Sequence, residues 1–333
     1  MVRRGRSRRS GRLIPLAVVA IALVLAAVWF AGPWLSWTGR PQGAKPIEVR
    51  VAPGDTLADA AASLERAKVI SSATHFRVLA RLFGSPAPIR AGDYGFYPSD
   101  GWRTYLRTMQ SGLSIQRLVT VPEGMPSILV HERLMKEPML TGRIEVPAEG
   151  SVLPDSYSFE RGEPRAAVLA RMQDAMKRAL AVEWRGRTAA SIVKTPREAV
   201  ILASVIEKET GVAGERRTVA GVYTNRLRVG MPLQADPTVI YPLTKGKPLG
   251  RRILRSELRA DNGYNTYARA GLPAGPIANP GRASIAAALN PAPTKALYFV
   301  ADGKGGHVFA NTLTEHKANV AKWYAIRRAR GEM

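Results

Sequence analysis

The chain has 333 residues, 46% of them hydrophobic, and its 49 Lys and Arg against 26 Asp and Glu give a formal net charge of +23. This length and apolar content allow one or two globular domains with real cores and exclude a disordered polymer. The absence of cysteine excludes disulfides and thiolate metal sites.

The first element that the sequence predicts is a membrane-spanning helix. Residues 1–12 contain six arginines and no acid, and residues 13–30 are almost wholly apolar, close to the length that crosses the hydrocarbon core of a bilayer. Trp29, Trp34 and Trp37 follow like the aromatic belt of a membrane interface. We therefore predict a basic cytoplasmic tail at 1–12, a transmembrane helix at 13–37 and a linker at 38–46.

The charge pattern also predicts where the protein lies. Basic residues stay on the cytoplasmic side, so we expect a single-pass protein of the cell inner membrane with a cytoplasmic N-terminus and a periplasmic folded part. The alternative is a cleaved signal peptide, but the run is long for one and lacks a small-residue cleavage site. The remaining positive charge suits an anionic extracellular polymer or lipid headgroups. An exported domain would not meet nucleic acid, so we expect no nucleic-acid partner.

A small mixed unit is predicted after the linker. Residues 47–51 alternate as a strand does, residues 57–64 and 75–83 have helical spacing, and residues 91–97 read as a returning strand. Between the first strand and helix lies the turn Pro53-Gly54-Asp55-Thr56, which ends in a helix cap. Another helix begins at Trp102.

The next stretch repeats the strand and turn device. A strand at 119–121 leads through Pro122-Glu123-Gly124 into an amphipathic helix at 127–135. The turn-rich segment 149–157 contains Glu149 and Asp155, acids that would lie near a cleft or cap backbone amides. A long helix with an apolar stripe is predicted over 166–184.

The central stretch begins with a strong helix start. Thr195 supplies a capping hydroxyl, Pro196 suits the first helical position, and Glu198 follows three residues after the cap. Residues 199–206 are apolar on every side apart from Ser204, which predicts a helix wrapped by other elements. Gly211 is suited to a left-handed turn that ends the helix.

Glu207 lies at the end of this helix, over its apolar side. Burial and the negative end of the helix dipole both disfavour an ionised carboxyl group there, which is what a proton donor requires. The alternative is that Glu207, Lys208 and Glu209 form an ordinary solvated helix end.

The C-terminal third combines short helices, a long loop and a hairpin. A helix is predicted at 219–227, and Asp236 reads as the cap of a short helix that reaches Tyr241. Residues 271–281 form a Gly/Pro-rich loop too long to be a mere connection. Strands at 296–300 and 307–309 flank a glycine turn. His307 and His316 lack the neighbours of a metal site, so we expect no metal and no cofactor.

Three runs of this sequence resemble the signature of one family. They are 203–210 (ASVIEKET), 225–227 (NRL) and 234–241 (QADPTVIY), and they are similar to the YceG-like endolytic murein transglycosylases of the MltG type. Ala274, where the family usually has a second proline, and Lys317, where it has asparagine, depart from the pattern. The turn at 53–57 resembles the opening of LysM glycan-binding modules.

The resemblance implies a fold and a division of the chain. It implies an α+β protein with a single N-terminal transmembrane helix, a LysM-like small subdomain at 47–114 and a mixed α/β YceG-like catalytic domain at 115–333. In the family the first glutamate of the Glu-Lys-Glu run is the catalytic acid, which corresponds to Glu207. The substrate-binding residues expected from the matched motifs and the cleft loop are Gln234, Asp236, Thr238, Tyr264, Asn265, Tyr267 and Asn279.

The activity implied is peptidoglycan cleavage by a lytic transglycosylase, a carbon-oxygen lyase. It would cut the MurNAc-GlcNAc bond of nascent glycan strands, leave 1,6-anhydroMurNAc ends and terminate elongation. One carboxyl group is enough, because the muramic C6 hydroxyl replaces water as the nucleophile, whereas glycosidases generally need two. The expected partners are glycan strands, the cytoplasmic membrane and peptidoglycan synthases. The alternative is a non-catalytic, membrane-anchored peptidoglycan-binding scaffold.

Overall fold

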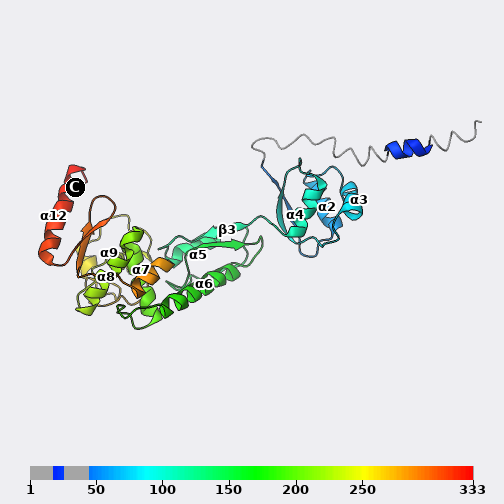
Figure 1. The fold of residues 1–333 in the computed structure, drawn as a ribbon. Coiled ribbons are helices and arrows are strands. Elements are labelled where there is room, and N and C mark those ends of the chain that lie inside the picture. Colours follow the sequence, from blue (N-terminus) through cyan, green and yellow to red (C-terminus); the bar gives the residue numbers. More distant parts are fainter. Residues whose placement is uncertain (1–17, 26–44, 333) are drawn as a thin grey trace, which may run out of the picture. The chain divides into compact units, whose positions relative to one another are not determined.

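The computed structural model of the chain describes residues 18–25 and 45–332 (Figure 1). Helices and short two-stranded antiparallel sheets alternate along it, so the predicted α+β class is confirmed. The chain divides into two compact units, unit 1 up to Gln116 and unit 2 from Arg117 onward. Each unit is described by itself.

Only part of the predicted transmembrane segment falls within the described residues. Residues 18–25 are helical and exposed, and the rest of 13–37 lies outside the described part. Within 18–25 and 45–332, no helix combines the length and the apolar character needed to cross a bilayer.

Unit 1 is built on a two-stranded antiparallel sheet. Strand β1 (Ile47–Val51) pairs with β2 (Gly92–Phe96), with Val49 opposite Tyr94. The connection holds α2 (Leu57–Arg66) and α3 (Ala73–Phe83), and α4 (Trp102–Ser111) follows β2. The predicted cap is confirmed, because Thr56 and Asp59 form a capping box at the start of α2. The core includes Leu64, Phe76, Tyr94, Phe96 and Met109.

Unit 2 contains two separate hydrophobic cores. The smaller core lies among β3 (Arg117–Thr120), its antiparallel partner β4 (Ser156–Phe159), α5 (Ser127–Lys136) and the first half of α6 (Arg165–Arg185). The larger core surrounds α7 (Pro196–Glu209), which contacts α6, α8 (Arg216–Arg228), α9 (Asp236–Thr244) and α11 (Arg282–Leu289).

Helix α7 has the environment that its sequence predicts. All eight residues from 199 to 206 are buried, and the Thr195 hydroxyl accepts a hydrogen bond from the Glu198 backbone N–H. The predicted left-handed end is wrong. Thr210 is extended, with φ −137°, Gly211 is not in the left-handed region, and the chain enters the short 3-10 helix η1 (Ala213–Glu215).

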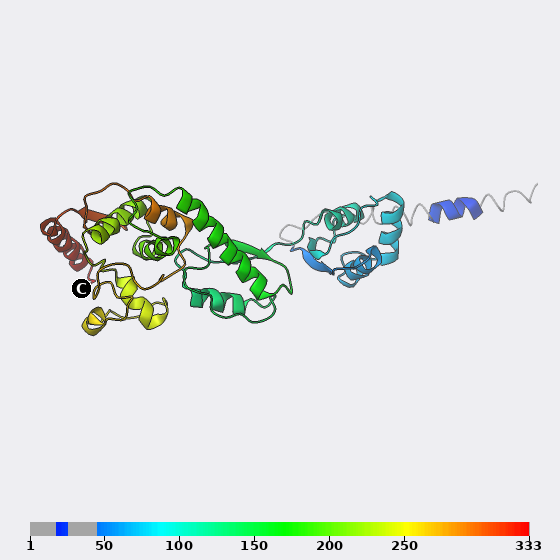
Figure 2. The same cartoon turned by 90° about the horizontal axis from the view of Figure 1, so that it is seen from below.

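The remaining elements cover the far end of unit 2. Strands β5 (Tyr298–Ala301) and β6 (His307–Ala310) form the predicted hairpin, α10 (Arg255–Arg259) is a single short helix, and α12 (Leu313–Ala329) packs on the hairpin. Both views show α12, in red, at the end of unit 2 opposite to α5 (Figures 1 and 2).

Candidate active site

Glu207 lies in the last turn of α7 with its side chain only 5% exposed. Its Oε2 atom accepts a 2.8 Å hydrogen bond from the backbone N–H of Gly281, the residue that caps α11. Its Oε1 atom lies 3.5 Å from Nη2 of Arg216, at the start of α8. The expected burial is confirmed, whereas the neighbouring cation was not predicted.

The Gly/Pro-rich loop 271–281 is hydrogen-bonded directly to α7. The Ser204 hydroxyl is completely buried, donates to the Ile201 carbonyl at 2.7 Å and accepts from the Ile277 N–H at 3.1 Å. The one polar residue in the apolar part of the helix therefore fixes residues 271–281 against it. This anchor holds the Gly281 N–H in place to meet Glu207.

A second carboxylate lies beside Glu207, and sequence reasoning missed it. Glu123 comes from the β3–α5 turn, is 48% exposed, and places Oε2 at 3.4 Å from the same Nη2 atom of Arg216. A Cβ atom on Gly281 would collide with the Glu123 carboxylate, so any larger residue there would displace the Glu123 side chain. The repeated strand and Pro/Gly turn at 119–124 was the signal that could have drawn attention to Glu123. Such a local motif does not predict that the residue lies near Glu207.

Glu149 and Asp155, for which the sequence allows a place near the cleft or a capping role, both cap backbone amides. Glu149 accepts a 2.9 Å hydrogen bond from the Ser127 N–H, and Asp155 accepts one of 2.7 Å from the Ser156 N–H. Burial raises the pKa of Glu149, partly offset by its hydrogen bonds to Ser127 and Tyr241.

Asn279 joins the two cores behind Glu207. It is fully buried, its side-chain N–H2 donates to the Met125 carbonyl at 2.9 Å and to the Ser127 hydroxyl at 3.0 Å, and its Oδ1 accepts from the Val152 N–H at 3.0 Å. The backbone of Asn279 also bonds to Gly124 and Met125. These bonds occupy the amide group, so Asn279 has a supporting role, and its contact with substrate stays a prediction.

Glu209, two residues beyond Glu207, faces a different environment. Its Oε1 atom is buried without a hydrogen-bond partner, and the buried Tyr223 hydroxyl interacts with the same carboxyl group. Burial, together with the negative charge of Asp236, raises the pKa of Glu209 to about 7, although Tyr223 and Arg226 act in the opposite sense. The sequence reasoning gave Glu209 no role.

Asp236 is not the cap that the sequence predicts. Ala235 precedes α9 as its cap without a side-chain bond, and Asp236 is the first helical residue. The Asp236 carboxylate instead accepts a 2.6 Å hydrogen bond from the Tyr267 hydroxyl. Gln234 is exposed beside it in a left-handed conformation with φ 53°, which is costly for a residue that is not glycine. Asp236, Tyr267 and Gln234 form an open polar group next to Glu209.

The other predicted binding residues support this polar group from within. The Thr238 hydroxyl is buried and lies 2.8 Å from that of Thr266. Asn265 is 3% exposed and donates to three backbone carbonyls of residues 257–260. Tyr264 packs against Tyr241 in a tilted arrangement, with ring centroids 5.0 Å apart. Direct contact of these residues with substrate remains a prediction.

The Asn-Arg-Leu motif holds loops in place. Asn225 donates to the carbonyls of Thr294 and Ala296 at 2.8 and 3.1 Å. Arg226 is buried and donates to the carbonyls of Leu233 and Leu297, each at 2.7 Å. The motif thereby fixes the segment before α9 and the start of β5, which explains two adjacent polar residues inside a buried helix.

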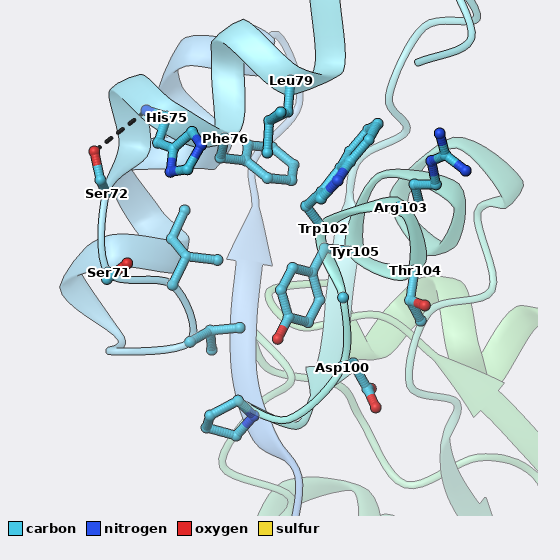
Figure 3. A pocket seen from close by; sticks show the side chains of 14 residues that line it. Ser71, Ser72, His75, Phe76, Leu79, Asp100, Trp102, Arg103, Thr104 and Tyr105 are labelled. Carbon is cyan, nitrogen blue, oxygen red and sulfur yellow. Dashed lines mark hydrogen bonds between the residues drawn. The ribbon is translucent and has the colours of Figure 1, made fainter. Parts of the chain in front are cut away.

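Hollows occur in both units of the described chain. One, of about 550 Å³, adjoins the Glu207 site through Arg216 and is otherwise lined mainly by small residues, among them Ala213, Ala283, Ala286 and Ala287. The other, of about 690 Å³, lies in unit 1 between α3 and α4 (Figure 3). There Phe76 and Leu79 face Trp102 and Tyr105, and the buried Trp102 Nε1 has no hydrogen-bond partner.

The arrangement in unit 2 defines a class of site. A buried carboxyl group stands at a helix end, beside a cation and a second acid, and faces a loop held by buried amides. Such a site can move a proton to and from a bound ligand. The two histidines are used elsewhere, since His307 pairs with Glu215 at 2.7 Å and His316 stacks on Tyr298.

Comparison with known proteins identifies the family. The model of the YceG-like family matches residues 49–322. The endolytic murein transglycosylase of Bacillus subtilis (strain 168) is 35% identical over 184 residues, which cover 55% of this chain and 50% of that protein. The enzyme of the same name from Streptococcus pneumoniae (strain R6) is 26% identical over 357 residues, covering 92% of this chain and 64% of that protein.

A solved structure agrees with this match. The crystal structure of a YceG-like protein from Listeria monocytogenes superposes with a TM-score of 0.51 at 27% identity, over 83% of this chain and 99% of that one. The chain therefore belongs to the YceG-like family. It spans between half and about two thirds of the length of the curated relatives that it matches.

Proposed function

We propose that the protein is an endolytic lytic transglycosylase that cleaves the MurNAc-GlcNAc bond of nascent peptidoglycan strands and so terminates their elongation. The observation that carries the proposal is the shielded carboxyl group of Glu207, fixed by the Gly281 N–H at the meeting point of the two cores. Membership of the YceG-like family and relatives named endolytic murein transglycosylase support it.

The chemistry follows from one proton carrier. Protonated Glu207 gives its proton to the oxygen that links muramic C1 to N-acetylglucosamine, and the C1–O bond breaks. Ionised Glu207 then takes the proton of the muramic C6 hydroxyl, whose oxygen bonds to C1 and closes the 1,6-anhydro ring. No water is consumed, and Glu207 ends in the protonation state in which it began.

The finer parts of the proposal concern position and partners. We propose that residues 13–37 anchor the protein in the cell inner membrane, with the folded part in the periplasm beside peptidoglycan synthases. The basic tail and apolar run of the sequence support the anchor. We propose unit 1 as LysM-like on the basis of its turn at 53–57 and its strand-helix-helix-strand order.

Product analysis tests the activity. Purified peptidoglycan is digested with the wild-type chain and with Glu207→Gln, and the fragments are analysed by mass spectrometry. We expect 1,6-anhydromuramic ends from the wild type and no new ends from the variant. Reducing muramic ends would instead identify a hydrolase, and full activity of Glu207→Gln would remove the acid assignment.

A non-catalytic peptidoglycan-binding scaffold is the second candidate. The hollow of unit 1 favours it, because aromatic faces and an unpartnered indole N–H suit a sugar ring. Pull-down of the full chain with insoluble peptidoglycan, beside Trp102→Leu and the control Trp184→Leu from unit 2, measures binding. Retained binding together with no cleavage by the wild type would establish the scaffold and reject the enzyme.

A further inference from the structure

The Glu207 site holds an unusual sharing of one cation by two acids. Nη2 of Arg216 lies 3.5 Å from Oε1 of Glu207 and 3.4 Å from Oε2 of Glu123. Both distances are long for a charge-assisted hydrogen bond, so neither acid holds the guanidinium tightly. The Arg216 side chain is only 11% exposed, and its buried Nε atom donates to no partner. Arg216 is therefore divided between its neighbours.

Charge balance gives this arrangement a consequence for a proton donor. Arg216 alone would favour the ionised form of Glu207, which cannot donate. The negative charge of Glu123, at the same nitrogen, offsets that effect. Glu123 and Arg216 together carry no net formal charge, so the cation that Glu207 meets is already shared with a second acid.

We propose that Glu123 is a positioning residue that engages Arg216 and thereby keeps Glu207 able to hold its proton. The proposal deepens the proposed transglycosylase function and rests on it for its kinetic readout. Glu123 acts through Arg216 rather than on the sugar. It also links the smaller core to the larger one, because Glu123 follows β3 whereas Glu207 and Arg216 belong to α7 and α8.

Other charged groups near Glu207 do not replace this pair. Lys208 lies alongside, with its Cδ atom and the Glu207 Cγ atom both near Gly124, but the residue is exposed. Arg282 follows Gly281 and is exposed as well. The Gly281 N–H donates to Glu207 from the α11 side. Glu123, in the turn between β3 and α5, is thus the second acid that Arg216 meets besides Glu207 of α7.

The sharpest test removes each charge separately and then both. In Glu123→Gln the cation is uncompensated, so we expect the alkaline limb of the kcat profile to move to lower pH by about one unit. In Arg216→Gln two acids face each other, and the limb should move to higher pH by a similar amount. The double variant should return near the wild-type profile. Unchanged limbs, or both single variants shifting in the same direction, would overturn the proposal.

A measurement without substrate separates this proposal from the proposed function. ¹³C NMR of carboxyl-labelled glutamate follows the titration of Glu207, with Glu207→Gln assigning the signal. We expect its midpoint to fall in Glu123→Gln and to stay unchanged in Glu163→Gln, which breaks the Glu163–Arg171 pair of the smaller core. A shift without any glycan cleavage would reject only the enzyme. Cleavage with an unshifted midpoint would reject only the role of Glu123.

Discussion

The last turn of α7 carries two glutamates whose surroundings differ in kind. Glu207 meets a cation, a backbone N–H and a half-exposed second acid, whereas Glu209 meets the buried Tyr223 and the negative charge of Asp236. A helix turns about 100° per residue, so side chains two residues apart leave on nearly opposite sides. A single charged helix end in the sequence is therefore two separate sites in the structure.

This contrast shows that burial by itself does not identify the catalytic acid. Glu209 has the environment that best suppresses ionisation, but its orphan oxygen faces the protein interior. The side-chain partners of Glu207 can give way to a ligand, because Arg216 is shared with Glu123 and the Glu123 side chain is half-exposed to solvent. A proton carrier needs access to a ligand as well as shielding.

The largest effect expected from the comparison is on cleavage. Glu207→Gln should lower the rate of glycan cleavage by about a thousandfold or more, since a general acid contributes roughly 10²- to 10⁴-fold and here one group serves both proton transfers. Glu209→Gln should retain most of the rate. The measurement is release of soluble fragments from purified peptidoglycan, with circular dichroism confirming the fold of both variants. Equal losses in the two variants would erase the distinction between the two sites.

The next effect concerns the support of the Glu207 side. Asn279→Ala removes hydrogen bonds to Met125, Ser127 and Val152 and leaves buried groups unpaired. We expect a loss of about 2–4 kcal/mol in the free energy of unfolding, measured with urea at pH 7. Asn262→Ala is the control, because Asn262 is exposed and accepts only local backbone N–H groups. A loss no larger than that of the control would mean that Asn279 does not hold the cores together.

Glu209 should govern the pH dependence of stability. Its pKa is raised from 4.5 to about 7, so it favours the folded state fully below pH 4.5, and that contribution is lost as the pH rises through about 7. Glu209→Gln cannot ionise. We expect it to match the wild type below pH 4.5 and to be more stable by on the order of 2 kcal/mol above pH 7.

Urea unfolding at several pH values measures this difference. Glu207→Gln is the matched control, as it replaces the neighbouring acid of the same helix end. A stability gain for Glu209→Gln that does not change between pH 4.5 and pH 8 would mean that the gain does not come from ionisation.

The sequence predicts local structure well where one segment decides it. Thr195 and Pro196 start α7 as expected, and the alternation of 47–51 gives β1. Prediction from the sequence fails where a contact with another segment decides the local conformation. Gly211 is not left-handed, because the chain leaves α7 through extended residues on either side of it before η1 begins. Asp236 does not cap α9, because Tyr267 takes its carboxylate.

The candidate site divides in the same way. The position of Glu207 at a buried helix end follows from the pattern of 195–211, and the family resemblance singles it out. Arg216 and Glu123 cannot be found in that manner, because Glu123 is 93 residues from Arg216 along the chain and their meeting depends on how the two cores pack. The same holds for the amide network of Asn279, whose partners lie more than 120 residues away.

The smallest effect tests whether the polar group beside Glu209 binds glycan. Tyr267→Phe removes the hydroxyl that donates to Asp236 at an exposed position, so the loss in unfolding free energy should be about 1 kcal/mol or less. If this group contacts substrate, KM for uncrosslinked glycan strands should rise a few-fold with kcat unchanged. Tyr157→Phe is the control, because it removes a similar hydrogen bond, to the Leu153 carbonyl, from the smaller core. A rise in KM for Tyr267→Phe but not for Tyr157→Phe would show that glycan contacts both the Glu207 face and the Glu209 face of the helix end. Identical KM values would show that substrate binds on the Glu207 face only.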